Sequence, residues 1–207
     1  MLIKDGMTVL FQGDSITDCG RREDEFAMGV GYAMRIASDF TARFPHLKVN
    51  FINRGIGGNR VCDLKNRWNE DCISLKPDIV SILIGINDVW RRYDNNDPTA
   101  VEDFKSDYRD ILTQIKDKTN AKIIICEPFV LPYPDDRIKW REDLDPKIQA
   151  IRELACEFSA IYIPLDGMFA AASAMQPSKN WANDGVHPTP AGHALIADAW
   201  LKVVSEI

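Results

Sequence analysis

The chain has 207 residues, of which 45% are hydrophobic and 27% are charged, and its formal net charge at pH 7 is -6. These ordinary values predict one globular domain over residues 1–207, and the acidic balance without a Lys/Arg block argues against a dedicated nucleic-acid binder. No apolar stretch is long enough for a membrane span or for the core of a secretory signal, so we expect no membrane partner.

Short apolar runs alternate along the chain with longer segments of helical period. We predict strands at residues 8–11, 49–52, 79–84, 122–126 and 161–165. We predict helices at residues 32–44, 103–118, 146–158 and 194–204, where apolar residues recur three and four positions apart. Strands and helices in alternation are typical of a three-layer α/β domain with a parallel sheet.

The longest irregular segments are residues 53–60, 85–98, 128–143 and 175–188, and each follows a strand or precedes the last helix. In open α/β sheets, ligands bind at the carboxyl ends of the strands. The functional residues are therefore expected in or beside these segments.

The cysteines argue against a disulfide-stapled or zinc-stabilised domain. Five are present, which is an odd number, and no two are spaced as Cys-x-x-Cys. This pattern favours a reducing, cytoplasmic environment. Asp14, Asp88 and Asp184 do not form a compact carboxylate cluster in the sequence, so we predict no metal and no other cofactor.

A serine stands just past the end of the first predicted strand, in the tripeptide Gly13-Asp14-Ser15. Its hydroxyl is expected at a loop edge that a substrate can reach. By itself the tripeptide is more typical of a strand-to-turn connection, because Gly, Asp and Ser are common turn residues. The serine is a nucleophile only if a base takes its proton and donors hold an oxyanion.

Only three histidines could supply that base. His46 lies in a helix-to-strand turn at the opposite end of the sheet, and His193 lies early in the last helix, where packing or capping is expected. His187 lies in a loop that leads into that helix, with Asp184 three residues upstream. A hydrogen bond from the imidazole to Asp184 would fix the tautomer and leave the other ring nitrogen facing Ser15. A polar turn that introduces a helix is the alternative interpretation of this loop.

Two other strand ends carry candidate oxyanion donors. The segment after the second strand is rich in glycine, which lets a backbone N–H point into a pocket without a Cβ in the way. Asn87 follows the third strand, and its amide could donate to a developing negative charge. The chain contains no Gly-x-Ser-x-Gly, Walker or His-Glu-x-x-His motif, and Arg60 replaces the third glycine of a dinucleotide fingerprint.

Taken together, these segments resemble the sequence blocks of the SGNH (GDSL-type) hydrolase superfamily, over nearly the whole chain. Ser15 matches the first block, Gly58 the second, Asn87 the third, and Asp184 with His187 the last. The resemblance implies a flavodoxin-like fold with a five-stranded parallel sheet flanked by helices. It also implies metal-free serine ester hydrolysis through a Ser15–His187–Asp184 triad. The oxyanion would be held by the backbone N–H groups of Ser15 and Gly58 and by the Asn87 side chain.

Within the superfamily, the strings around Ser15 and Asn87 are most similar to bacterial carbohydrate esterases of the acetylxylan esterase type. We therefore expect removal of a short acyl group, above all acetyl, from carbohydrates such as imported xylo-oligosaccharides. The alternatives are a broad-specificity short-chain esterase, lysophospholipase or thioesterase, and a non-catalytic sugar-binding relative.

Flat aromatic and polar side chains near the expected site suit a sugar, although aromatic residues also occur at interfaces. A homo-oligomer is compatible with the tryptophan-rich loops. The residues predicted to bind substrate are Asp14, Trp90, Arg91 and Trp181, and Tyr93 and Trp140 lie in the same loops.

Overall fold

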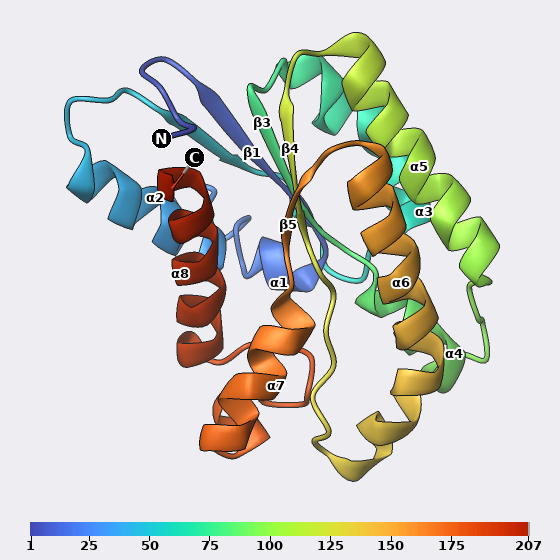
Figure 1. The fold of residues 1–207 in the computed structure, drawn as a ribbon. Coiled ribbons are helices and arrows are strands. Elements are labelled where there is room, and N and C mark those ends of the chain that lie inside the picture. Colours follow the sequence, from blue (N-terminus) through green and yellow to red (C-terminus); the bar gives the residue numbers. More distant parts are fainter. Residues whose placement is uncertain (207) are drawn as a thin grey trace.

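A parallel sheet of five strands forms the centre of the computed structural model, which describes residues 1–206 (Figure 1). The strand order β2-β1-β3-β4-β5 is that of flavodoxin-like folds. The predicted α/β fold with five parallel strands is thus confirmed. The strands are β1 (Thr8–Gly13), β2 (Asn50–Asn53), β3 (Ile79–Leu83), β4 (Lys122–Cys126) and β5 (Ile161–Ile163).

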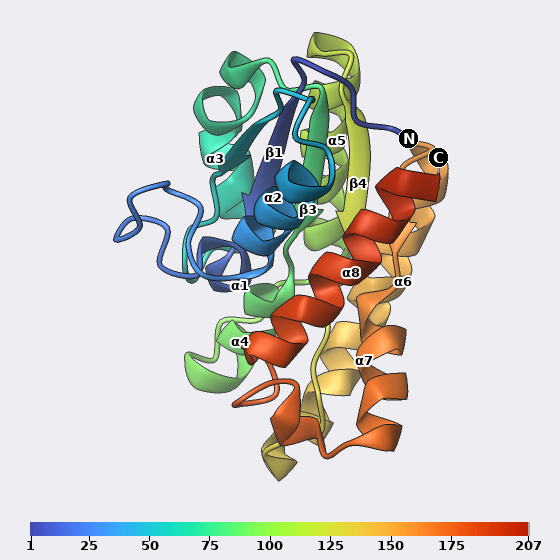
Figure 2. The same ribbon diagram turned by 90° about the vertical axis from the view of Figure 1, so that its left-hand side faces the viewer.

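Helices cover both faces of the sheet (Figures 1 and 2). One face packs against α2 (Tyr32–Arg43) and α8 (Pro190–Glu206). The other packs against α3 (Val61–Asp71), α5 (Val101–Lys118) and α6 (Arg141–Glu157). The remaining helices are α1 (Ser15–Asp18), α4 (Ile86–Asp94) and α7 (Leu165–Met175), with short 3-10 turns at Ile73–Leu75, Asp135–Trp140 and Ser178–Asn180.

The central strands are apolar on both faces because each face meets a helical layer. In β3, Val80 and Ile82 join the core under α3 and α5, whereas Ile79 and Leu83 join the core under α2 and α8. All five residues of this strand are buried. The near-continuous apolar runs in the sequence reflect this double coverage.

The structure corrects the start of one predicted helix and contains helices that were not predicted, among them the short α1. Helix α6 begins at Arg141, so that Pro146 lies inside it and does not start it. Acidic residues in its first turn complement the helix dipole, and a buried Asp143–Lys147 ion pair at 2.8 Å spans the proline. Helices α3, α4 and α7 were not predicted, and α4 occupies much of a segment expected to be irregular.

The start of helix α3 is indicated by a polar residue and not by its few apolar positions. Only Val61, Leu64 and Trp68 are buried along its eleven residues. Its start is marked instead by Asp63, whose carboxylate accepts the Arg60 N–H at 2.8 Å in a capping box. An acidic residue three positions after a helix start was therefore the readable cue.

Short helices gather at the carboxyl ends of the strands, as Figure 1 shows. Helix α1 follows β1, α4 follows β3, and α7 follows β5, while the segment 54–60 follows β2. The residues predicted to carry chemistry therefore share one edge of the sheet. Within residues 1–206, none of the helices combines the length and the apolar character needed to cross a bilayer.

Candidate active site

Three residues predicted to act together form a continuous hydrogen-bonded chain. The Ser15 Oγ lies 2.9 Å from the His187 Nε2, and the His187 Nδ1 lies 2.7 Å from the Asp184 Oδ2. Ser15 and His187 are 172 positions apart in the sequence, so only the fold joins them. With Nδ1–H donated to Asp184, Nε2 is free to accept the serine proton.

The loop from Asp184 to His187 is built to hold the carboxylate beneath the imidazole. The Asp184 Oδ1 accepts the backbone N–H groups of Val186 and His187 at 3.0 and 2.7 Å. Gly185, which lies between Asp184 and Val186, adopts φ +84°. A Cβ on this residue would lie 2.2 Å from the Tyr133 carbonyl oxygen. Glycine is required at this turn, because a side chain would push the loop away from the wall that supports it.

The contacts between Asp184 and His187 shift the pKa values of the two side chains in opposite directions. Partial burial alone raises the pKa of Asp184, but the hydrogen bonds from His187 and Val186 outweigh it and hold the pKa well below its usual range. The hydrogen bond to Asp184 raises the pKa of His187 above its ordinary value of 6.5. The pair therefore stabilises the imidazolium that forms when His187 takes a proton.

Asp14 lies beneath the site and not in it. Its side chain is 1% exposed, and its Oδ1 accepts the Ile16 N–H at 3.0 Å, capping the short helix that carries Ser15. The other oxygen is buried without a hydrogen-bond partner among the described residues. Burial raises the pKa of Asp14 to about 7. The prediction that Asp14 binds substrate is therefore corrected, because the carboxylate has no exposed surface to offer a sugar.

The predicted oxyanion donors follow three neighbouring strand ends, those of β1, β2 and β3. Neither the Ser15 N–H nor the Gly58 N–H has an acceptor within residues 1–206. Gly58 adopts φ +82°, and a Cβ built on the preceding Gly57 would lie 3.8 Å from the Ser15 Cβ, so this loop passes directly beside the serine. The Asn87 side chain is buried, and its Nδ2 gives one hydrogen to the Asn59 carbonyl at 3.1 Å. Its second amide hydrogen remains available.

Trp90 and Arg91 lie beside these groups in the helix α4. The Trp90 ring is 5.7 Å from the His187 ring, so it forms a wall of the site. The Arg91 Nη2 donates to the Asn87 Oδ1 at 3.4 Å, and its Nη1 pairs with Asp94. Arg91 therefore helps to orient the Asn87 amide, a role that the sequence did not suggest.

The other candidate aromatic residues differ in their distance from Trp90, since Trp140 packs on the Trp90 ring with centroids 5.2 Å apart. Trp140 is buried and stacks on Tyr93 with ring centroids 5.3 Å apart. Trp181 lines a hollow of about 550 Å³ with Met168 of α7 and Leu195 of α8.

Arg137 is a residue of the site that sequence reasoning missed. Its Nε donates to the Asp184 carbonyl at 3.1 Å, and its guanidinium packs 4.1 Å from the Trp140 ring centre and 5.1 Å from that of Trp90. It thus joins the loop that carries His187 to the aromatic wall. Its position in a loop far along the chain offered no signal.

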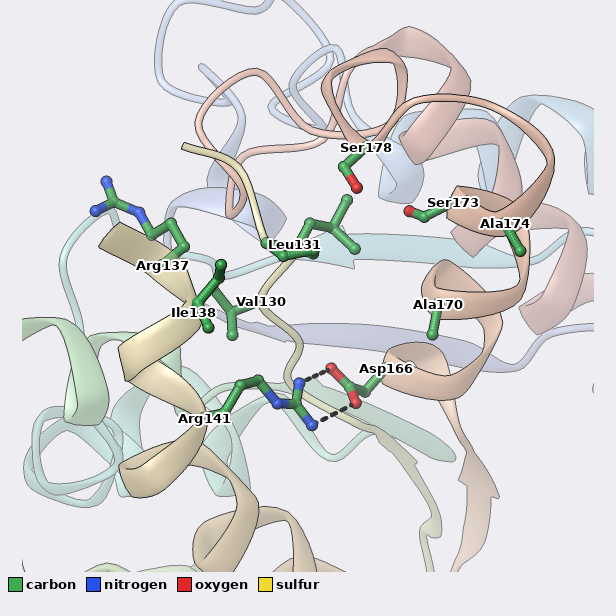
Figure 3. A pocket seen from close by; sticks show the side chains of 11 residues that line it. Val130, Leu131, Arg137, Ile138, Arg141, Asp166, Ala170, Ser173, Ala174 and Ser178 are labelled. Carbon is green, nitrogen blue, oxygen red and sulfur yellow. Dashed lines mark hydrogen bonds and ion pairs between the residues drawn. The ribbon is translucent and has the colours of Figure 1, made fainter. Parts of the chain in front are cut away.

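The stem of Arg137 also lines a separate cavity of about 530 Å³. Figure 3 shows its guanidinium pointing away from this cavity, while Arg141 and Asp166 pair at another side of it. The remaining walls are largely apolar residues of α7 and the 130–138 segment, and none of the three triad positions is among them.

The other two histidines lie apart from the hydroxyl of Ser15. His46 is exposed. The His193 Nδ1 accepts the Tyr32 N–H at 3.1 Å at the start of α2, so this histidine caps a helix as expected. Burial lowers the pKa of His193 to about 4, which keeps it neutral.

Comparisons with known proteins agree with this geometry. Residues 11–195 match the model of the GDSL-like lipase/acylhydrolase family. The chain is 35% identical to an acetylxylan esterase of Geobacillus stearothermophilus, over 99% of this chain and 96% of the relative.

Solved structures are equally similar. A variant of that esterase superposes with a TM-score of 0.91 at 35% identity, covering 99% of this chain and 97% of the other. A GDSL-like lipase from Parabacteroides merdae superposes with a TM-score of 0.91 at 36% identity, covering 98% and 97%. Structures of the Geobacillus enzyme include catalytic mutants in which a serine, an aspartate or a histidine is replaced by alanine.

Proposed function

Because the chain belongs to the GDSL-like lipase/acylhydrolase family, we propose that it removes acetyl groups from carbohydrates such as xylo-oligosaccharides. It is a carboxylic ester hydrolase. The observation that carries the proposal is the hydrogen-bonded chain from Ser15 through His187 to Asp184, beside unpaired N–H donors. Serine, aspartate and histidine are also the residues replaced in the catalytic mutants of the Geobacillus relative.

In the first half of the proposed reaction, Ser15 Oγ attacks the acetyl carbonyl while its proton passes to His187 Nε2. The negative charge on the carbonyl oxygen is stabilised by the N–H groups of Ser15 and Gly58 and by the Asn87 amide. The tetrahedral intermediate then breaks its bond to the sugar oxygen, which takes the proton from His187. The products are a free sugar hydroxyl and acetyl-Ser15.

In the second half, a water molecule gives a proton to His187 and attacks the acetyl carbonyl. Collapse of this second intermediate returns the proton to Ser15 Oγ and releases acetate. Asp184 stays ionised throughout, since its role is to hold the imidazole and to stabilise its charged form.

The choice of an acetylated sugar has two supports. The Geobacillus relative is described as an acetylxylan esterase and, in other structures, as an acetyl-xylooligosaccharide esterase. The half-buried Trp90 ring beside His187 is a flat surface of the kind on which a sugar ring packs.

A substrate panel tests this function. We expect the purified protein to hydrolyse acetylated xylobiose and xylotriose with a higher kcat/KM than the octanoyl esters of the same sugars. The kcat/KM should also be higher than that for acyl thioesters. A clear preference for octanoyl or thioester substrates would instead support a broad-specificity esterase, lysophospholipase or thioesterase. Binding of the sugars without acetate release would support a non-catalytic sugar-binding relative.

The pH profile provides a further prediction. His187 acts as a base only when it is neutral, so kcat/KM should rise with pH as the imidazole loses its proton. The hydrogen bond to Asp184 raises the pKa of His187, and the nearby Asp14 raises it further when ionised. The acid limb of the profile should therefore have its midpoint above 6.5.

Initial rates with acetylated xylobiose from pH 5 to pH 9 measure this midpoint. Asp14→Asn keeps an acceptor for the Ile16 N–H but removes the charge, so it should move the midpoint to lower pH. A wild-type midpoint below 6.5 would contradict the proposed role of His187.

The cytoplasmic location, the bacterial source, the single domain over residues 1–207 and the homo-oligomer stay predictions from the sequence. The small-molecule or oligosaccharide ester is the substrate that we propose for the enzyme.

A further inference from the structure

The side chain of Arg67, a residue of α3, is only 14% exposed. It reaches from the helix to two of the strand ends that surround Ser15. Its Nε donates to the Asn59 Oδ1 at 2.9 Å, and its Nη2 donates to the Gly13 carbonyl at 3.4 Å. Its Nη1 binds the Gln12 Oε1 at 3.1 Å and the Asp71 Oδ2 at 3.0 Å. A single guanidinium therefore spans β1, the loop after β2 and α3.

The Asn59 end of this contact leads to two of the proposed oxyanion donors. Asn59 directly follows Gly58, and its own N–H is tied to the Ile56 carbonyl at 3.2 Å. Its carbonyl accepts the Asn87 Nδ2 at 3.1 Å. A shift of Asn59 would thus move the Gly58 N–H and release the Asn87 amide.

The Gly13 end leads to the third donor. Gly13 is two residues before Ser15, and its carbonyl also accepts the Ile56 N–H at 3.1 Å. There is no free space around it, because a Cβ at this position would lie 2.4 Å from the Leu83 carbonyl oxygen. The Arg67 Nη2 therefore donates to a tightly packed strand end that lies two residues before Ser15.

We propose that Arg67 is a positioning residue that aligns the oxyanion donors of Ser15, Gly58 and Asn87 through its simultaneous bonds to Gly13 and Asn59. The inference rests on the proposed function, since it assigns Arg67 to the same reaction. The planar guanidinium suits this task, because its donors have a fixed geometry that one lysine ammonium cannot reproduce across two separate acceptors.

The charge of Arg67 is paired with a carboxylate on its own helix, so its bonds to Gly13 and Asn59 are not needed to neutralise it. Asp71 lies one helical turn away on α3 and pairs with Arg67 at 3.0 Å. Arg67→Lys retains the positive charge beside Asp71 while losing the span from Gly13 to Asn59. It is therefore the variant that tests geometry with the least disturbance of charge.

We expect Arg67→Lys to lower kcat by roughly 10- to 100-fold with little change in KM, because displaced donors weaken binding of the transition state more than binding of the substrate. Arg109→Lys is the matched control, since Arg109 is an arginine of α5 that pairs with Glu157 on the surface. Its kcat should equal that of the wild type. Circular dichroism and thermal melting of each variant check the fold.

A double-mutant cycle with Asn87→Ala distinguishes positioning from general stabilisation. If Arg67 acts through the oxyanion donors, Arg67→Lys should lower kcat much less in the Asn87→Ala background than in the wild type. Equal fold-losses in both backgrounds, or an unchanged kcat for Arg67→Lys, would overturn the proposal. Should Arg67→Lys fail to fold, Asn59→Ala breaks the same contact and leaves Gln12 and Asp71 paired with the arginine, and the same two outcomes apply.

All rates are measured on both acetylated xylobiose and p-nitrophenyl acetate. A wild type that hydrolyses only the aryl acetate removes the sugar assignment and leaves the Arg67 test intact. A wild type inactive on both substrates overturns the proposed function and this inference together.

Discussion

Ser15→Ala should lower kcat on acetylated xylobiose by at least three orders of magnitude. The substitution removes the Oγ that lies 2.9 Å from His187 Nε2 and that forms the acyl-enzyme. Without it, water must attack the ester directly, with only the oxyanion donors and substrate binding to assist. The residual rate should be the same in Ser15→Ala and in Ser15→Ala/His187→Ala, because triad members act as a unit.

The fold should survive this change, since it removes only one half-buried hydroxyl, which makes a single side-chain hydrogen bond. Ser173→Ala is a matched control, because Ser173 lines the cavity beside α7, whose walls include none of the three triad positions. Its turnover should equal that of the wild type. Turnover of Ser15→Ala within tenfold of the wild type would exclude Ser15 as the nucleophile.

Asp184→Asn should lower kcat by about 10⁴-fold at neutral pH. A loss of this size follows when asparagine replaces the aspartate of a Ser-His-Asp triad. The asparagine can keep its Oδ1 on the backbone N–H groups of Val186 and His187. Its Nδ2 would then donate to His187 Nδ1 at the position where the carboxylate now accepts. The imidazole would carry its proton on Nε2 and could not accept the proton of Ser15.

Kinetics at neutral pH measure this loss, and KM should change little because Asp184 does not face the substrate. Asp107→Asn serves as the control, since Asp107 is a surface aspartate paired with Lys65. A loss of less than tenfold in Asp184→Asn would mean that another group, such as a backbone carbonyl, orients His187.

Local patterns were sufficient wherever a residue's role depends on its neighbours in the chain. The apolar runs predicted all five strands because each is covered on both faces. The three-residue spacing of Asp184 and His187 predicted their contact, since a tight loop closes over that distance. The tripeptide ending in Ser15 predicted a serine at a strand end.

Residues whose role depends on distant parts of the chain were assigned wrongly or missed. Asp14 looked like a polar group at a loop edge, whereas the tertiary packing buries it. Arg137 meets Asp184 across 47 positions, so nothing near it in the sequence indicated the contact.

The sequence by itself determined the strands, the four longest helices and the chemical groups available at the strand ends, because hydrophobic period and turn chemistry act over a few residues. Only the tertiary structure showed that His187, the predicted base, meets Ser15, which carboxylates are buried, and that Arg67 lies between Gly13 and Asn59. These outcomes depend on strand order and helix packing, which bring together atoms separated by 54 to 172 positions. The surroundings of Ser15 are therefore a property of the fold, whereas the tripeptide by itself indicated only a serine at a strand end.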